Sequence, residues 1–230
     1  MEEINKIKSI SIWIFIVSFV ALNACLILIT KFPDFFPNKE DLILNTIPYI
    51  DVGASISRTA RVFPTYLIFK PAMFLTSYLL IKYWIYNKKI ISSFEVNHKH
   101  IKKIVFFGIA SAVCLVLHSI FLGIKFDYNL YKLFRRIIIL SFIIFELVAQ
   151  AFLVITFYSI KKNILEFINE KYLKLKAILV SILVFVAIVS LPIVTMPGNK
   201  QLKHALEGDY FLGVICFYLL TFLMWKTSKK

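Results

Sequence analysis

The chain has 230 residues, of which 60% are hydrophobic and 17% are charged, and its formal net charge is +14. Soluble domains contain roughly 45–50% apolar and about 25% charged residues, so this composition excludes an ordinary soluble fold. The positive residues fall in short clusters between apolar blocks. Such clusters are typical of membrane topology signals and of attraction to anionic lipids, so the charge does not indicate a nucleic-acid partner.

The apolar blocks are about 20 residues long, which is the length that a helix needs to cross the hydrocarbon core of a bilayer. Because each crossing segment must satisfy its own backbone hydrogen bonds, the blocks predict helices. The sequence therefore predicts an all-α integral membrane protein, a bundle of six transmembrane helices that forms one domain over residues 1–230. The predicted spans are residues 10–30, 62–86, 104–124, 137–160, 177–196 and 210–225.

An even number of crossings places both chain ends on one side of the membrane. With Lys70 set aside, the side that holds the chain ends carries 16 Lys and Arg residues, and the other side carries 10. Positive residues concentrate in cytoplasmic loops, so both termini are predicted to be cytoplasmic. The sequence does not distinguish a plasma or inner membrane from an endomembrane.

The longest connection between predicted spans, residues 31–61, lies on the non-cytoplasmic side. Asp51, Arg58 and Arg61 come shortly before the second span. Two arginines near the membrane surface suit a phosphate group, because a guanidinium binds phosphate oxygens through two parallel hydrogen bonds. Anchoring of the helix end at the interface is the alternative interpretation.

Four polar side chains lie within different predicted spans at a similar depth. Asn23, Lys70, His118 and Glu146 fall roughly 9–14 Å below the non-cytoplasmic surface at 1.5 Å per residue. Gln150 follows Glu146 by four residues and so shares its helix face. Since a charge in lipid is costly, we expect a Lys70–Glu146 ion pair that faces the bundle interior, with His118 and Asn23 nearby. Such a pair can also serve only to hold two helices together.

Two further polar residues, His204 and Glu207, come before the last span and share a helix face. With His118 they are the candidate acid–base groups if a reaction takes place, and whether the protein is an enzyme is left open. A catalytic zinc site needs about three protein ligands and an open position. The non-cytoplasmic side offers His118 and His204 as its histidines and no H-E-x-x-H motif, so no metal or cofactor is expected.

Short motifs in this chain resemble those of the DRAM and post-GPI-attachment-factor group. Residues 48–53, with the pattern P-Y-I-D-x-G, and the following Phe63-Pro64 resemble the group's P-[FY]-I-S-x-x-G signature. His204-x-x-Glu207 is similar to its H…E-W element. The resemblance implies a six-helix membrane protein with cytoplasmic termini and a role with lipids, either remodelling of GPI-anchor lipid or organisation of phospholipids. The departures are Asp51 for Ser, an early Gly53, and Gly208 for Trp.

The sequence thus favours recognition or handling of a phospholipid-like molecule of the outer leaflet in an outward-facing polar pocket. In this hypothesis Arg58 and Arg61 hold a phosphate, Lys70 and Glu146 form the pocket floor, and the partners are membrane lipids, including anionic phospholipids. One alternative is a small-solute transporter or channel subunit, which would need polar groups through the full membrane thickness. Apart from Ser and Thr, the inner halves of the spans are nearly all apolar in sequence, which argues against a path through the membrane. Another alternative is a non-catalytic scaffold.

Overall fold

The computed structural model describes residues 2–39, 42, 56–96, 98–124, 126, 128–195 and 200–226. Within these ranges the chain is helical apart from turns, loops and one isolated bridge between Ile168 and Trp225, so the predicted all-α class is confirmed. The helices are α1 Glu2–Lys31, η1 Pro33–Phe35, α2 Ile56–Thr59, α3 Tyr66–Phe94, α4 Ile101–Phe121, α5 Asn129–Ser159, α6 Lys161–Ile164, α7 Glu170–Thr195 and α8 Lys200–Met224.

Four of the described helices are long and apolar enough to cross a membrane, which is compatible with a helical membrane protein. They are α1, α4, α5 and residues Glu170–Ser190 of α7. The apolar part of α8, Gly208–Met224, is shorter. In α3, lysines at positions 70, 82, 88 and 89 interrupt the apolar sequence.

The helices run beyond the apolar blocks from which their positions were predicted. α3 continues to Phe94 although its predicted span ended at residue 86, and α7 already begins at Glu170. Charged residues such as Lys and Glu have good helix propensity, so a helix continues past the point where its sequence stops being apolar. Hydropathy therefore locates the membrane-compatible part of each helix rather than its ends.

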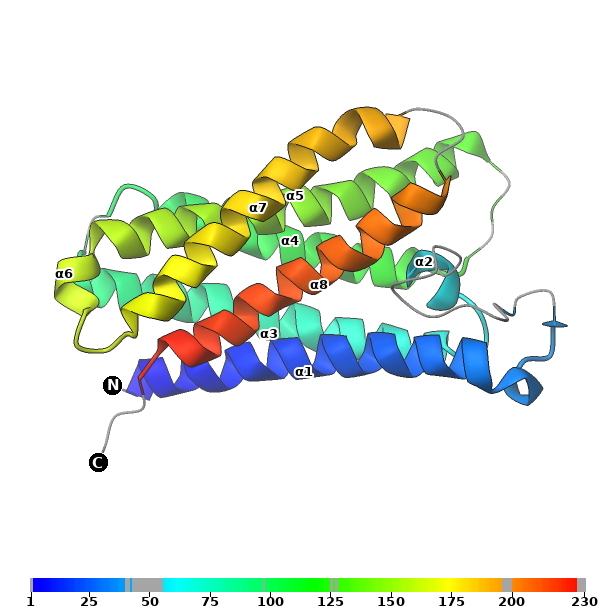
Figure 1. The fold of residues 1–230 in the computed structure, drawn as a ribbon, viewed down its shortest axis with the longest axis horizontal. Coiled ribbons are helices and arrows are strands. Elements are labelled where there is room, and N and C mark those ends of the chain that lie inside the picture. The colour runs from blue at the N-terminus through cyan, green and yellow to red at the C-terminus, as the bar shows by residue number, and fades with distance from the viewer. Residues whose placement is uncertain are drawn as a thin grey trace.

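The six long helices form a closed ring in which most neighbours follow one another in the sequence (Figure 1). α1, α3, α4 and α5 pack in that order, α7 packs on α5 and on α8, and α8 returns to α1. α5 and α8 contact each other only slightly. The beginning of α1 and the end of α8 lie at the same end of the bundle, where Lys8 Nζ is 5.0 Å from the centre of the Phe222 ring. We call this the terminal end, and the opposite end, which holds α2, the α2 end.

At the terminal end, backbone hydrogen bonds tie the loop before α7 to the residues that follow α8. Asn169 N donates to Met224 O at 2.8 Å, and Lys226 N donates to Phe167 O at 2.9 Å. The buried Trp225 ring packs edge-on against Phe157, with centroids 5.7 Å apart. These contacts fix the last turn of α8 to α5 and α7.

Candidate functional site

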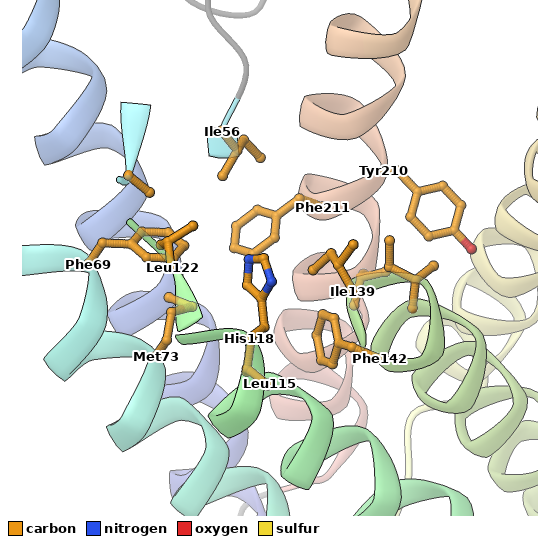
Figure 2. Close-up of a pocket in the computed structure, with 13 residues that line it drawn as sticks. Ile56, Phe69, Met73, Leu115, His118, Leu122, Ile139, Phe142, Tyr210 and Phe211 are labelled. Carbon is orange, nitrogen blue, oxygen red and sulfur yellow. The ribbon is translucent and has the colours of Figure 1, made fainter. Parts of the chain in front are cut away.

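A cavity of about 60 Å³ lies inside the α2 end of the bundle (Figure 2). Residues of α2, α3, α4, α5 and α8 contribute to its wall, which is almost entirely apolar. Figure 2 shows the His118 imidazole of α4 directed into the space between Leu122, Ile139 and Phe211, whereas the Tyr210 ring turns away from it. His118 thus lies in the interior of the bundle, in surroundings that are apolar rather than polar.

Deeper in the bundle, the Glu146 carboxylate of α5 is fully buried and receives hydrogen bonds from three helices. Ser111 Oγ of α4 donates to Oε2 at 2.6 Å, and Gln150 Nε2 of α5 donates to Oε1 at 3.0 Å. Tyr218 Oη of α8 makes a short hydrogen bond to the same Oε1. Since a buried carboxylate without partners would cost several kcal/mol, these donors explain how the bundle accommodates Glu146.

A smaller hollow of about 20 Å³ lies beside Glu146 and shares a wall with the cavity at His118. Ser18 of α1 and Thr76 of α3 line its other side and are hydrogen-bonded to each other at 3.1 Å. A space of this size is large enough for one water molecule. The two hollows follow one another along the bundle, and the residues common to both are Met73, Leu115, Phe142, Phe211 and Val214.

The terminal half of the bundle contains a second buried charged residue, Lys176 of α7, which is fully enclosed. Its Nζ donates to Thr221 Oγ1 at 2.8 Å and lies 4.0 Å from the centre of the Phe217 ring. Thr221 Oγ1 is also 3.2 Å from Tyr83 Oη. The Thr221 hydroxyl proton is directed to Phe217 O at 2.9 Å, so its oxygen accepts from both Lys176 and Tyr83.

The sequence analysis did not single out the buried Lys176. It was one of the 16 Lys and Arg residues counted for the side that holds the chain ends, and it lies one residue before the predicted span 177–196, whereas the structure encloses it in the bundle. A helical pattern in the sequence signals its position, because Leu173, Lys176, Val180 and Leu183 fall on one face of α7 and are all buried. Tyr83, Tyr218 and Thr221 were also missed, since single hydroxyl groups do not stand out in an apolar segment.

The predicted ion pair between Lys70 and Glu146 is wrong. Lys70 Nζ instead contacts Ile120 O at 3.4 Å and lies 5.6 Å from the centre of the Tyr66 ring. The carbonyl groups of the last turn of a helix lack intrahelical donors and attract a cation, and Ile120 is in the last turn of α4. Lys70 contacts α4 at Ile120, whereas Glu146 contacts it at Ser111, nine residues away, so the two residues lie at different heights. Lys70 also does not share the helix face that carries Phe69, Met73 and Ser77 inward.

Asn23 also lies apart from the buried carboxylate. Its Nδ2 donates to Phe19 O at 2.7 Å in the preceding turn of α1, which is a local contact. Of the four residues predicted to form one polar layer, the structure therefore brings His118 and Glu146 to the interior hollows and leaves Lys70 and Asn23 outside them. Gln150 does lie beside Glu146, as the four-residue spacing predicted.

The predicted phosphate and acid–base residues of the loops fall mostly where the structure gives no side chains. Asp51 lies outside the described residues, as do the side chains of Arg58, His204 and Glu207. Arg61 is described and exposed, and its carbonyl oxygen would lie 2.9 Å from a side chain at Gly123, whose φ is 84°. Among the described residues no group of three His, Cys, Asp or Glu side chains is placed to hold a metal ion.

No protein-family model matches the chain, and no curated protein or solved structure is significantly similar to it. The resemblance to the DRAM and post-GPI-attachment-factor group stays a prediction from the motifs.

Proposed function

We propose that the chain crosses the membrane six times, with both ends in the cytoplasm, and that it binds a lipid-like molecule in the cavity of the α2 end. The common position of the beginning of α1 and the end of α8 supports an even number of crossings. The excess of Lys and Arg at that end supports its cytoplasmic location, and the excess remains when Lys176 is removed from the count. The cavity then lies toward the non-cytoplasmic leaflet.

The observation that carries this proposal is an interior apolar cavity with one imidazole directed into it. Sites for small ligands are mostly apolar with a few polar groups that fix orientation. The apolar wall of this cavity suits hydrocarbon, and His118 supplies a hydrogen-bonding group for an ester or hydroxyl. The proposal therefore moves the ligand's hydrocarbon, rather than its headgroup, into the interior.

A cavity of about 60 Å³ holds only a few methylene groups, so the remainder of the ligand lies outside it. Ile139 and Phe142 of α5 and Phe211 and Val214 of α8 face each other across the cavity. α5 and α8 contact each other little, and α7 packs on both. A lipid chain that enters the cavity from the bilayer would pass between α5, α7 and α8. A phosphate at the polar end of the lipid would then come near the membrane surface, where Arg58 and Arg61 are its candidate ligands.

The test is to fill the cavity and measure which lipids remain bound. Ile139→Trp places an indole in the cavity, and Ile144→Trp adds the same ring to a position on α5 that is 55% exposed. Purified protein of each variant is analysed by native mass spectrometry and lipid extraction. We expect Ile139→Trp to lose a specific co-purified lipid and Ile144→Trp to retain it. Equal lipid content in both variants would contradict the proposal.

The headgroup part of the proposal has its own test. Arg58→Ala combined with Arg61→Ala removes both candidate phosphate ligands, and Lys31→Ala with Arg136→Ala removes the same charge from exposed positions. We expect only the first pair to reduce the share of anionic lipid that co-purifies. An equal reduction by both pairs would indicate general electrostatic attraction rather than a binding site.

A second candidate function is a small-solute transporter, which the sequence analysis argued against. The observation in its favour is a second buried ionisable side chain, Lys176, whose partner Thr221 lies one turn along α8 from Tyr218, the partner of Glu146. Flux of labelled small solutes into proteoliposomes tests it. A transport activity that is lost in Lys176→Met and retained in Lys174→Met, an exposed neighbour, would support this candidate over lipid binding.

A further inference from the structure

The Glu146 carboxyl group has surroundings that suit both its ionised and its protonated form. Ser111 Oγ lies 2.6 Å from Glu146 Oε2 and 2.8 Å from Gly108 O. A serine hydroxyl carries a single proton, so it donates to only one of these two oxygens at a time. The choice between them follows from the protonation state of Glu146.

When Glu146 is ionised, Ser111 donates to Oε2, and Oε1 accepts from Gln150 and Tyr218. When Glu146 is protonated on Oε2, the carboxyl proton is donated to Ser111 Oγ, and the Ser111 hydroxyl turns toward Gly108 O. Oε1 keeps both of its hydrogen bonds. Rotation of the Ser111 hydroxyl therefore converts the hydrogen-bond partners of the carboxylate into partners that suit the acid. No contact between helices is broken.

Few charged groups surround this carboxyl group. Thr76 and Ser18 face the adjacent hollow from α3 and α1, and Tyr218 is the one other titratable side chain that lines it among the described residues. Tyr83 of α3 packs edge-on against Tyr218, with ring centroids 4.9 Å apart. The Tyr83 hydroxyl is hydrogen-bonded to Thr221, which is also hydrogen-bonded to Lys176 of α7. On α4, His118 lies two turns beyond Ser111, in the neighbouring cavity.

The hollow beside Glu146 adjoins the cavity of the α2 end. The 20 Å³ space beside the carboxyl group is large enough for one water molecule, and it shares a wall with the cavity at His118. Gln150 Oε1, next to Glu146, is buried without a hydrogen-bond partner in the described part of the chain. Buried polar atoms without a protein partner are commonly hydrogen-bonded to an ordered water molecule.

We propose that Glu146 is a reversible proton-binding site that exchanges its proton with water at the α2 end of the bundle. A hydronium ion in the hollow transfers its proton to Glu146 Oε2, which leaves water and a neutral carboxylic acid, and the reverse transfer restores the carboxylate. This inference does not depend on the lipid proposal, because its readout is the carboxyl group itself.

Infrared difference spectroscopy of the full-length protein in lipid nanodiscs tests the proposal. As the pH falls, the C=O stretch of a protonated carboxylic acid in an apolar setting is expected to grow. It should be absent in Glu146→Gln and present in Glu170→Gln, which alters a partly exposed carboxylate paired with Lys161 and Lys174. A band that survives in Glu146→Gln, or no such band in the wild type over the accessible pH range, would overturn the proposal.

Tyr218→Phe keeps the test decisive if Glu146→Gln does not fold. This variant retains the aromatic packing against Tyr83 but removes one donor from Oε1. A donor stabilises the carboxylate more than the acid, so the midpoint of the band should move to higher pH. An unchanged midpoint would contradict the assignment of the band to Glu146.

The route to the α2 end is tested by the rate at which the carboxyl proton exchanges for deuterium. Val214→Phe enlarges a side chain in the wall common to both hollows and should slow the exchange. Ile178→Phe, on a surface of α7 that is 56% exposed, is the control and should leave the rate unchanged. Equal rates in the two variants would exclude this route.

Discussion

The two halves of the bundle differ in how tightly the helices meet. In the terminal half, Trp84 closes directly over Gly108, the buried Lys176 is held by Thr221, and backbone hydrogen bonds tie residues 224–226 to the loop before α7. In the α2 half, the helices surround a cavity of about 60 Å³. The difference suggests that the terminal half holds the ring of helices together, so that the α2 half is free to contain a space for a ligand.

The largest expected effect comes from adding a methyl group where α3 and α4 are closest. A Cβ at Gly108 would lie 2.3 Å from Cγ of the Trp84 indole, which is rigid and fully buried. We expect Gly108→Ala to lower the free energy of unfolding by about 3 kcal/mol, the upper part of the range for overpacking. Thermal unfolding in detergent micelles measures the change.

Gly213→Ala is the matched control for this prediction. The new Cβ would also be too close, at 2.6 Å, but its neighbour is the Cδ2 end of Leu183, which is able to rotate. A loss of about 1 kcal/mol, in the lower part of the same range, is expected. Equal losses for the two glycines would show that the α3–α4 contact is no more rigid than the contact between α7 and α8.

The next largest effect concerns the buried lysine of the terminal half. Thr221→Val removes the hydroxyl that accepts from Lys176 and Tyr83, and leaves the buried Lys176 amino group without its hydrogen bond. We expect a loss of about 2 kcal/mol. Lys176→Met should cost little or even stabilise the bundle, since replacing a buried charge with an apolar side chain of similar size is often favourable.

The double variant Lys176→Met/Thr221→Val completes a thermodynamic cycle for this pair. If Thr221 acts mainly by solvating the Lys176 ammonium, the valine costs less in the methionine background than in the wild type. Additive losses would mean that Thr221 contributes to stability independently of Lys176, through its contact with Tyr83.

A smaller effect is expected from acid at the terminal end, where His100 lies beside Phe152 with ring centroids 5.1 Å apart. Burial lowers the pKa of His100 from its usual 6.5, and the positive charge of Lys99 and Lys103 lowers it further. The unfolded chain therefore binds a proton before the folded chain does, and stability is lost as the pH falls below 6.5. His100→Gln should flatten this part of the pH profile of thermal unfolding, and an unchanged slope would contradict the assignment.

The sequence predicted the helical class because an apolar block of about 20 residues has few other solutions in a membrane. It also identified Glu146 and His118, since a polar side chain in such a block must find an interior partner or space. The Lys70–Glu146 pair was predicted wrongly because depths counted from predicted span ends placed the two residues in one layer, whereas their partners on α4, Ile120 and Ser111, are nine residues apart. Depth also gives no direction around the helix axis. Lys176 was missed for another reason, because it lies at the edge of an apolar block and only its helix face reveals its burial.

The smallest expected effect concerns Lys70. Lys70 Nζ has a long contact of 3.4 Å to Ile120 O, and the Glu146 carboxylate is served by Ser111, Gln150 and Tyr218 instead. Lys70→Gln should therefore change the free energy of unfolding by no more than about 0.5 kcal/mol, as is usual for substitutions away from buried networks. It should also leave the infrared band of Glu146 at the same midpoint. A shift of that midpoint would mean that Lys70 influences the carboxylate after all, because removal of a nearby cation destabilises the ionised form.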